Sequence, residues 1–236
     1  MTEGLADLTG AVETELAGEP VALLPQRGLF WPRESTLFVA DLHLGKCETF
    51  RKAGAPIPAG VLEETLARLD SAIETCAAQR LVVLGDLTHA PIGVTETMIS
   101  TVRAWRDATD VEMVLVHGNH DRHLKRSGMV ELAQTWSMDL LNPGAALGPF
   151  TLLHEPERFD ASHALAGHLH PSVYLRGGGD AVKTQVFWTS GGAGAGGTTV
   201  LPAFSFFAAG TSITNAKGDG VWAVTPQRVI ELSPLA

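Results

Sequence analysis

Residues 114–121 read VLVHGNHD, an apolar run that ends in a group of polar side chains. Residues 114–116 predict a buried strand of a parallel sheet, and Gly118 allows the chain to turn sharply at the carboxyl end of that strand. Open α/β sheets bind their ligands at this end of their strands. The polar residues at the predicted turn are Asn119, His120 and Asp121. The stretch therefore predicts a ligand site, provided that other strands end in the same way.

Four other apolar runs end in acidic or imidazole side chains, namely residues 36–40, 81–84, 150–153 and 164–166. The polar residues that follow these runs are Asp41, His43, Asp86, His154, His168 and His170. One buried histidine is usually a hydrogen-bonded core residue, but a core has no need of such groups at successive strand ends, where burial without a partner is costly. The repetition therefore predicts that these side chains share one site.

The remaining pattern predicts an α/β fold with a β-rich second half. Apolar residues at helical spacing predict helices over residues 60–78 and about 95–108. Short runs predict hairpins over residues 11–16, 21–24 and 29–31, and strands at QVFWTS, TVLPAFSFF, GVWAV and RVIEL. The glycine-rich run 191–197 lacks the Lys-Ser/Thr ending of a phosphate loop, so it predicts a flexible loop. The length of 236 residues favours a single domain over residues 1–236.

Composition narrows the classes of function. The formal net charge of −9 argues against a broad basic surface for duplex nucleic acid, although a local basic groove remains compatible with it. The acidic N-terminal segment lacks the features of a signal peptide, and no stretch is long enough to span a bilayer, so we expect a cytoplasmic protein with no membrane contact. Cys47 and Cys76 have neither disulfide-scaffold nor zinc-finger spacing.

The polar strand ends have the chemistry of a metal centre. Carboxylate, imidazole and amide donors together suit borderline divalent ions, with manganese preferred and iron or zinc as alternatives. The candidate ligands are Asp41, His43, Asp86, Asn119, His154, His168 and His170. They are too many for one tetrahedral site and suit two ions about 3.5–4 Å apart that share a carboxylate, for which Asp86 is the candidate. Asp41 and His43 are two residues apart, as are His168 and His170, so in an extended chain both side chains of each pair lie on one side. Each pair could then bind the same metal ion.

Two adjacent cations would activate water and neutralise charge on a phosphoryl group, so the implied reaction is phosphoester hydrolysis. His120 could protonate the leaving oxygen while Asp121 holds its imidazole in orientation. Basic residues that follow motifs could bind substrate phosphate, although a solvated surface role is an equal alternative. These residues are Lys46, Arg51 and Arg122.

The motifs DLH, GD, GNHD, a strand-end His and GHLH, in this order, resemble the calcineurin-like metallophosphoesterases over about residues 36–171. The stretches DLHLGKCETFRKAGAPIP, GDLTHA, GNHDR, HEP, GHLHP and LPAF are similar to a bacterial branch described as DNA-ligase-associated phosphoesterases or endonucleases of a DNA damage response. The resemblance implies two facing mixed sheets flanked by helices, DNA as a substrate, and ligase and helicase partners. Two departures are Glu155, where the wider superfamily has glycine, and SFFAAG, which lacks a glycine expected after LPAF.

The resemblance also implies how the ligands divide between the metals. Asp41, His43, Asp86 and His170 would hold one ion, and Asp86, Asn119, His154 and His168 the other. His120 matches the histidine beside the scissile phosphate, and Asp121 matches its supporting acid. The nearby histidines outside this set are His89, His117, His123 and His163, and we assign them no role in the site.

Three functions remain open at this point. The first is a two-metal phosphodiesterase or nuclease linked to DNA repair, which the resemblance favours. The second is a small-molecule phosphodiesterase or phosphomonoesterase, which the negative charge favours. The third is a catalytically idle binding scaffold of the same fold, which the complete ligand set disfavours.

Overall fold

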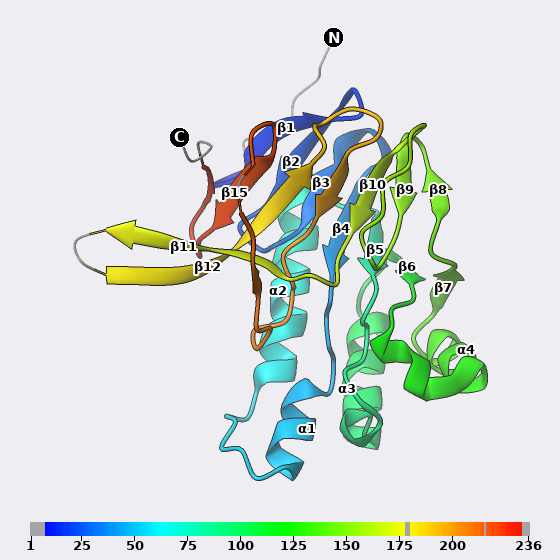
Figure 1. Ribbon diagram of the computed structural model, residues 1–236. Coiled ribbons are helices and arrows are strands. Elements are labelled where there is room, and N and C mark those ends of the chain that lie inside the picture. Colours follow the sequence, from blue (N-terminus) through cyan, green and yellow to red (C-terminus); the bar gives the residue numbers. More distant parts are fainter. Residues whose placement is uncertain (1–7, 178–179, 215, 233–236) are drawn as a thin grey trace.

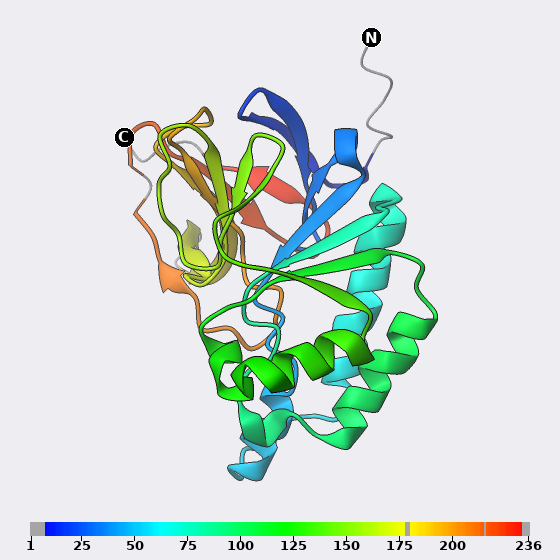
Figure 2. The ribbon, with the colours of Figure 1, turned by 90° about the vertical axis from the view of Figure 1, so that its right-hand side faces the viewer.

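Two β-sheets face each other across a shared apolar layer, and helices cover the outer side of the first sheet (Figures 1 and 2). The computed structural model describes residues 8–177, 180–214 and 216–232, without the side chains of residues 123 and 125–127. His123, one of the histidines to which we assign no role, therefore has its side chain outside the described part. Within the described residues, no helix is long and apolar enough to cross a membrane.

The first sheet contains seven strands in chain order. They are β1 (Val12–Leu16), β2 (Glu19–Leu23), β3 (Leu29–Trp31), β4 (Thr36–Ala40), β5 (Arg80–Leu84), β6 (Glu112–Val116) and β7 (Met138–Leu141). Strands β1 to β4 pair antiparallel as hairpins, whereas β4 to β7 run parallel. The parallel register aligns Ala40 with Leu84, and Leu84 with Val116. The residues that follow these three strands therefore emerge along one edge of the sheet.

The second sheet is built from the second half of the chain. Its path is β14-β11-β12-β13-β10-β9-β8, and β15 and β16 extend it from β12. The strands are β8 (Ala145–Leu147), β9 (Phe150–Leu152), β10 (His163–Ala166), β11 (Pro171–Gly177), β12 (Asp180–Ser190), β13 (Thr198–Val200), β14 (Thr211–Ser212), β15 (Gly220–Val224) and β16 (Val229–Glu231). Strands β9, β10 and β13 are parallel to one another, so β9 and β10 also deliver their following residues to one edge.

Side-chain alternation along β4, β5 and β6 explains why the first sheet is covered on both faces. Leu37, Leu81 and Leu115 belong to the apolar cluster on the helix side. Phe38 and Val82 belong to the cluster between the sheets. The helices are α1 (Lys46–Lys52), α2 (Val61–Cys76), α3 (Glu96–Asp107) and α4 (Lys125–Thr135), with single 3-10 turns η1 (Pro32–Glu34), η2 (Pro91–Gly93) and η3 (His120–Leu124).

Most elements predicted from the sequence are present within one or two residues of the expected bounds, and the residues from 191 to 197 form a loop. The run TVLPAFSFF was predicted as a strand, and this is wrong after Val200. Its second half leaves the sheet at Pro202, which cannot donate a ladder hydrogen bond, and Ala203 instead bridges to Ala40 at the end of β4. The pattern also missed the helices α1 and α4 and the strands β7, β8, β11 and β14.

Truncation of Phe150 tests the packing of the two sheets. Its ring is fully buried and lies edge-on to Trp31 and Phe38, with centroid separations of 5.1 and 6.3 Å. We expect Phe150→Ala to lower the free energy of unfolding by about 3–5 kcal/mol in urea titrations, because it opens a cavity between the sheets. The matched control Ile92→Ala, at a side chain that is 50% exposed, should change it by less than about 0.5 kcal/mol. Equal losses would mean that the sheets do not share this core.

Candidate metal centre

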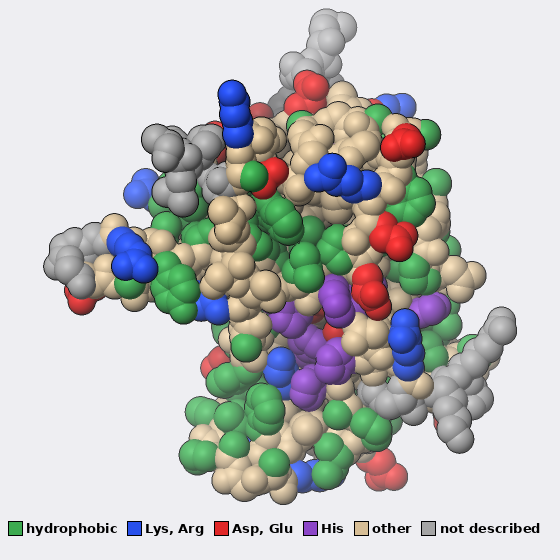
Figure 3. All heavy atoms as spheres, in the orientation of Figure 1, with side chains coloured by type: hydrophobic (Ala, Val, Ile, Leu, Met, Phe, Trp, Pro, Cys, Tyr) green, Lys and Arg blue, Asp and Glu red, His purple; other side chains and the backbone are tan. Residues whose placement is uncertain are grey.

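The residues that follow β4, β5, β6, β9 and β10 meet at the edge where the two sheets come together, and Figure 3 shows the histidine side chains gathered on that face. All the predicted ligands belong to this cluster: Asp41, His43, Asp86, Asn119, His154, His168 and His170. Asp41, His43, Asp86 and His154 are buried, and the others are half-buried.

A first group of possible ligand atoms comes from Asp41, His43 and His170, which approach within 4.8 Å of one another. The Nε2 atoms of His43 and His170 are 3.3 Å apart, and the Nε2 of His170 is 3.4 Å from Asp41 Oδ2. The predicted pairing of Asp41 with His43 in one group is therefore observed.

A second group comes from Asp86, His154 and His168, again within 4.8 Å. The side-chain oxygen of Asn119 adds to it, at 2.6 Å from His154 Nε2 and 3.1 Å from His168 Nδ1. The predicted grip of His168 and His170 on a common centre is wrong, because the two imidazoles belong to different groups. Both residues have left-handed backbone conformations, with φ of 69° and 47°, so the chain is not extended there and the period of two does not hold.

Asp86 lies between the two groups. Its Oδ2 is 3.9 Å from His43 Nε2, on the side of the first group, and its Oδ1 is 3.3 Å from His154 Nε2, on the side of the second. The backbone N–H of His120 also donates to Asp86 Oδ1 at 2.9 Å and fixes the carboxylate. Asp86 thus presents one oxygen to each group.

The backbone at the cluster is strained. Asp41, His43 and Asp86 have φ of 55°, 47° and 41°, in the left-handed region that costs non-glycine residues about 1–3 kcal/mol each. Hydrogen bonds between the loops hold these conformations, since the N–H of His43 donates to the carbonyl of Asp86 at 2.8 Å and the N–H of Ser205 donates to the carbonyl of Asp41 at 3.2 Å. Strain of this kind concentrates at functional sites.

The glycines of the motifs make room for the cluster. A Cβ at Gly118 would lie 2.4 Å from Asp86 Oδ1, and a Cβ at Gly85 would lie 1.9 Å from His154 Nδ1. Gly85 also has a φ of +77°, which side chains rarely tolerate. The glycines in GD and GNHD are therefore required by the close approach of the ligand side chains themselves.

Burial and like charge set the pKa values of the cluster. Burial, with the neighbouring Asp86 charge, raises the pKa of Asp41 well above its usual range. Burial raises the pKa of Asp86 to about 6. Burial lowers the pKa of His43 to about 2, and those of His154 and His170 to about 4. The imidazoles are thus neutral with lone pairs available, while the charge of Asp86 raises the pKa of Asp41 and that of Lys46 lowers it in part.

These donors fit divalent metal ions. Imidazole nitrogens, carboxylate oxygens and one amide oxygen converge in two groups, and this donor set suits borderline ions. The buried Oδ1 of Asp41 has no hydrogen-bond partner among the described residues, which a cation would compensate.

His120 is oriented differently from the prediction. Its Nδ1 lies 2.9 Å from the backbone carbonyl of His89, which only accepts, so Nδ1 carries the proton, and Nε2 lies 3.9 Å from Asp86 Oδ2. The carboxylate of Asp121 instead accepts from the backbone N–H groups of Leu87, Thr88 and Gly118 at 3.2, 2.9 and 3.1 Å. The predicted role of Asp121 in holding the imidazole is therefore wrong, and its carboxylate joins the loops after β5 and β6.

His89, to which the sequence analysis assigned no role, belongs to the site. Its ring stacks on that of His120, with centroids 5.2 Å apart, and lies edge-on to that of His43 at 5.3 Å. The atoms of His43, His89 and His120 form a third group that could hold a metal. The sequence feature that could have identified His89 is its position three residues after Asp86. His163, by contrast, is buried within the second sheet between Gly194 and Thr199.

The candidate phosphate-binding residues differ in their surroundings. Lys46 is 8% exposed at the start of α1, and its pKa is lowered by burial and raised in part by the charges of Asp41 and Asp86. The guanidinium of Arg51 donates to the carbonyls of Ile57 and Pro58 and pairs with Glu48, so its contacts in the structure are internal, and its predicted substrate role stays a prediction. These contacts tie α1 to the loop that follows it.

Arg122 lies at the rim and pairs with a second rim residue. Its exposed guanidinium is 3.8 Å from the carboxylate of Glu155, the residue that follows His154. The pair joins the loops after β6 and β9.

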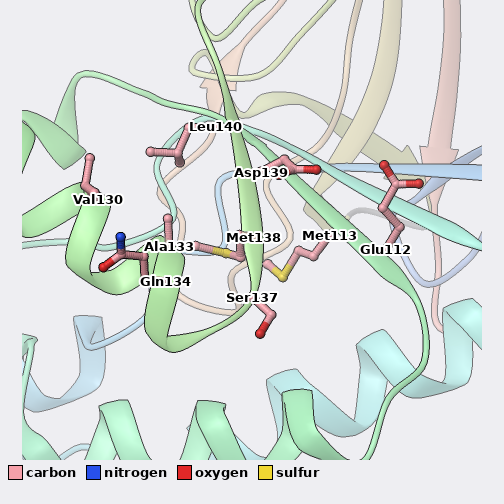
Figure 4. A pocket seen from close by; sticks show the side chains of 9 residues that line it. All are labelled: Glu112, Met113, Val130, Ala133, Gln134, Ser137, Met138, Asp139 and Leu140. Atoms are coloured by element: carbon pink, nitrogen blue, oxygen red, sulfur yellow. The ribbon is translucent and has the colours of Figure 1, made fainter.

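Grooves elsewhere on the surface do not coincide with the cluster. One of about 510 Å³ lies between α4 and β7 and is lined by apolar side chains such as Met113, Val130 and Met138 (Figure 4). A second, of about 590 Å³, reaches Gly118 and Arg122 at the edge of the site. A small cavity of about 20 Å³ is lined in part by His43 and Lys46, at the inner side of the cluster.

A family model for calcineurin-like phosphoesterases matches residues 35–179, the segment that carries the strand ends described above. The chain belongs to the calcineurin-like phosphoesterase family. The predicted resemblance and the predicted fold of two mixed sheets with flanking helices are thereby confirmed. Membership makes this phosphoesterase a metal-dependent hydrolase of phosphoester bonds, which sets aside the alternative of an idle scaffold.

Among solved structures, the phosphoesterase is similar to the nuclease MPE of Pseudomonas putida, with 30% sequence identity and a TM-score of 0.78 over 94% of this chain and 100% of that chain. A protein of unknown function from Aquifex aeolicus is 18% identical, with a TM-score of 0.39 over 57% of this chain and 78% of that chain, and this likeness carries no argument. No curated protein matches the chain significantly.

Metal binding by this phosphoesterase should depend on pH through Asp86. Ligation requires ionised carboxylates, so protons compete with metal at Asp86 below its pKa of about 6, and also at Asp41, whose pKa is raised well above its usual range. The imidazoles of His154 and His170 stay neutral down to about 4. We expect manganese to raise the melting temperature at about pH 8 and progressively less as the pH falls through about 6.

The comparison must be made with metal-free protein at each pH. Without metal, the raised pKa of Asp86 means that the folded state binds the proton more tightly, so this group's contribution to stability is lost as pH rises from 3.8 through about 6. A manganese-induced shift of equal size at both ends of the range would contradict the role of Asp86.

Proposed function

We propose that this phosphoesterase uses two divalent metal ions to hydrolyse phosphodiester bonds of nucleic acid, in a role linked to DNA repair. The observation that carries the proposal is the position of Asp86, with one oxygen toward His43 and the other toward His154. The likeness to a solved nuclease over nearly the whole chain supports nucleic acid as the substrate. Ligase and helicase partners follow from the resemblance of the motifs.

We assign the first ion to Asp41, His43, Asp86 and His170, and the second to Asp86, Asn119, His154 and His168. When bound, such ions neutralise phosphoryl charge and make water a nucleophile near neutral pH. Manganese is the preferred ion, because neutral imidazoles outnumber the carboxylates and harder ions such as magnesium favour oxygen ligands.

The chain's own residues bind the substrate and move the proton. The ammonium of Lys46, buried beside the cluster, can bind a phosphoryl oxygen as a point charge. Arg122 at the rim can leave Glu155 for a neighbouring phosphate, since an exposed ion pair is worth only about 0–1 kcal/mol. His120 keeps Nδ1–H bound to the carbonyl of His89 and can deliver a proton from Nε2 to the leaving oxygen.

The substrate class is tested by offering the manganese-loaded protein a chromogenic phosphodiester, a chromogenic phosphomonoester, and single-stranded and duplex DNA. We expect turnover of the diester and of DNA. Turnover of the monoester with intact DNA would favour the small-molecule alternative, for which the net charge of −9 is the supporting observation.

Asp86→Ala should abolish activity more completely than loss of any other single ligand, because Asp86 is the residue assigned to both ions. Metal analysis of the purified variant should show that binding of both ions is weakened. His170→Ala, which removes a ligand assigned to one ion, provides the matched comparison. A variant of Asp86 that retained both ions and near-normal turnover would show that the bridging assignment is wrong.

His120→Ala should keep the metals and the fold while losing about a hundred- to ten-thousand-fold in rate, as expected for a general acid. The loss should be small for nitrophenyl esters, whose leaving groups need no proton, and large for nucleotide esters, whose alkoxides do. If both substrates lose the same factor, His120 binds the phosphoryl oxygens electrostatically and does not protonate the leaving group.

A further inference from the structure

The β11–β12 hairpin projects from the body of the molecule, and its first strand begins directly after a candidate ligand (Figure 1). Strand β11 starts at Pro171, the residue after His170. Three residues of β11 separate His170 from Tyr174, and the four steps along the chain span about 13 Å when extended. The hairpin therefore begins at the candidate metal centre and leads away from it.

One face of this hairpin is aromatic and basic. Tyr174 pairs with Lys183, and Arg176 pairs with Ala181, so these side chains stand on the same face of the antiparallel pair. Tyr174 is 53% exposed, and the Nζ of Lys183 lies 5.9 Å from its ring centroid. We call Tyr174, Arg176 and Lys183 the hairpin face.

The hairpin face continues into the candidate metal centre. Lys183 Nζ donates to the carbonyl of Gly210, and the N–H of Thr211 donates to the carbonyl of His170 at 3.0 Å. The segment containing Gly210 and Thr211 thus contacts both the hairpin and the loop that carries His170. In Figure 3, basic and hydrophobic side chains over β11 and β12 lie on the same side of the molecule as the histidines.

The opposite face of the hairpin has a different character. Val173 and Leu175 are half-buried against the small core beneath β12 and β15. Alternation puts Asp180 and Val182 on this face, and Val182 is 63% exposed. Arg176 and Lys183 thus lie on one face of the hairpin and Asp180 lies on the other. Val182, on the face with Asp180, is a position for a control substitution.

We propose that the hairpin face binds an unpaired segment of the nucleic-acid strand next to the scissile phosphate, with a base stacked on Tyr174 and phosphates contacted by Arg176 and Lys183. The inference rests on the proposed function and specifies where its substrate lies. A base exposes its face for stacking only when it is unpaired, so the hairpin face selects single-stranded segments over duplex. The ammonium of Lys183 has three hydrogen-bond donors, and one of them is used by the carbonyl of Gly210. The others can therefore donate to phosphate.

Charge complementarity supports this occupant. The chain as a whole has a formal charge of −9, which repels nucleic acid, so a strand needs a local cationic path to reach the site. Arg176 and Lys183 provide such a path on the side of the metal centre. Each phosphate contact on a single strand should contribute about −0.7 to the slope of log affinity against log salt.

The test measures binding of a fluorescent single-stranded oligonucleotide by anisotropy in EDTA, and KM for its cleavage with manganese. Tyr174→Ala should raise the dissociation constant about 5- to 150-fold, and Tyr174→Phe should keep near-wild-type binding because the ring remains. Arg176→Ala should reduce the salt slope by about 0.7. A duplex of the same sequence should bind wild-type protein more weakly.

Two controls leave the hairpin face intact. Val182→Ala removes an exposed side chain from the other face of the same hairpin, and Arg103→Ala removes an exposed arginine from α3. Both should bind the oligonucleotide as wild type does. Turnover of a chromogenic diester, which has no strand to reach Tyr174, should be unchanged in every variant and reports that the metal centre is folded.

The possible failures are distinguishable. If wild-type protein cleaves the oligonucleotide and Tyr174→Ala does so with unchanged KM and affinity, the inference is overturned and the proposed function stands. Weakening by Val182→Ala equal to that by Tyr174→Ala would also overturn it. If wild-type protein hydrolyses the chromogenic diester but neither binds nor cleaves the oligonucleotide, nucleic acid is the wrong substrate and the inference falls with it.

Discussion

Two carboxylates, those of Asp41 and Asp86, are buried at the ends of neighbouring parallel strands, and the rest of the site is arranged around that constraint. Their pKa values are raised by burial, and the charge of Asp86 adds to the effect on Asp41. Two buried carboxylates whose charge is compensated only in part, here by Lys46, are costly in an apolar environment. Neutral imidazoles add no positive charge, whereas divalent cations held between acids and imidazoles would add it.

The same constraint explains the local backbone. Ligand side chains that converge from short loops need left-handed turns at Asp41, His43 and Asp86, and glycines where a Cβ would enter the cluster. Loops this strained would relax if they stood alone. Asp121 prevents this, because one carboxylate accepts hydrogen bonds from both the loop after β5 and the loop after β6.

The sequence predicted the strands and the ligand residues at their ends, because the apolar runs and the polar residues after them are local patterns. The sequence did not predict hydrogen-bond partners that depend on tertiary structure. Nothing local tells that the guanidinium of Arg51 binds Ile57 and Pro58, or that the carbonyl of His89 accepts from His120. The period of two failed at His168 and His170 because that rule assumes an extended chain, and the backbone there is left-handed.

The ligands also divide between the two sheets, with consequences for stability. Asp41, His43, Asp86 and Asn119 follow strands of the first sheet, whereas the remaining candidates, His154, His168 and His170, follow strands of the second. The two groups Asp41/His43/His170 and Asp86/His154/His168 each contain residues from both sheets. Metal bound there would act as a cross-link, and its binding free energy would add to that of the apolar layer in holding the sheets together. Sheet packing and the geometry of the metal centre are therefore coupled. A shift of one sheet against the other would displace the ligands of the first sheet relative to those of the second.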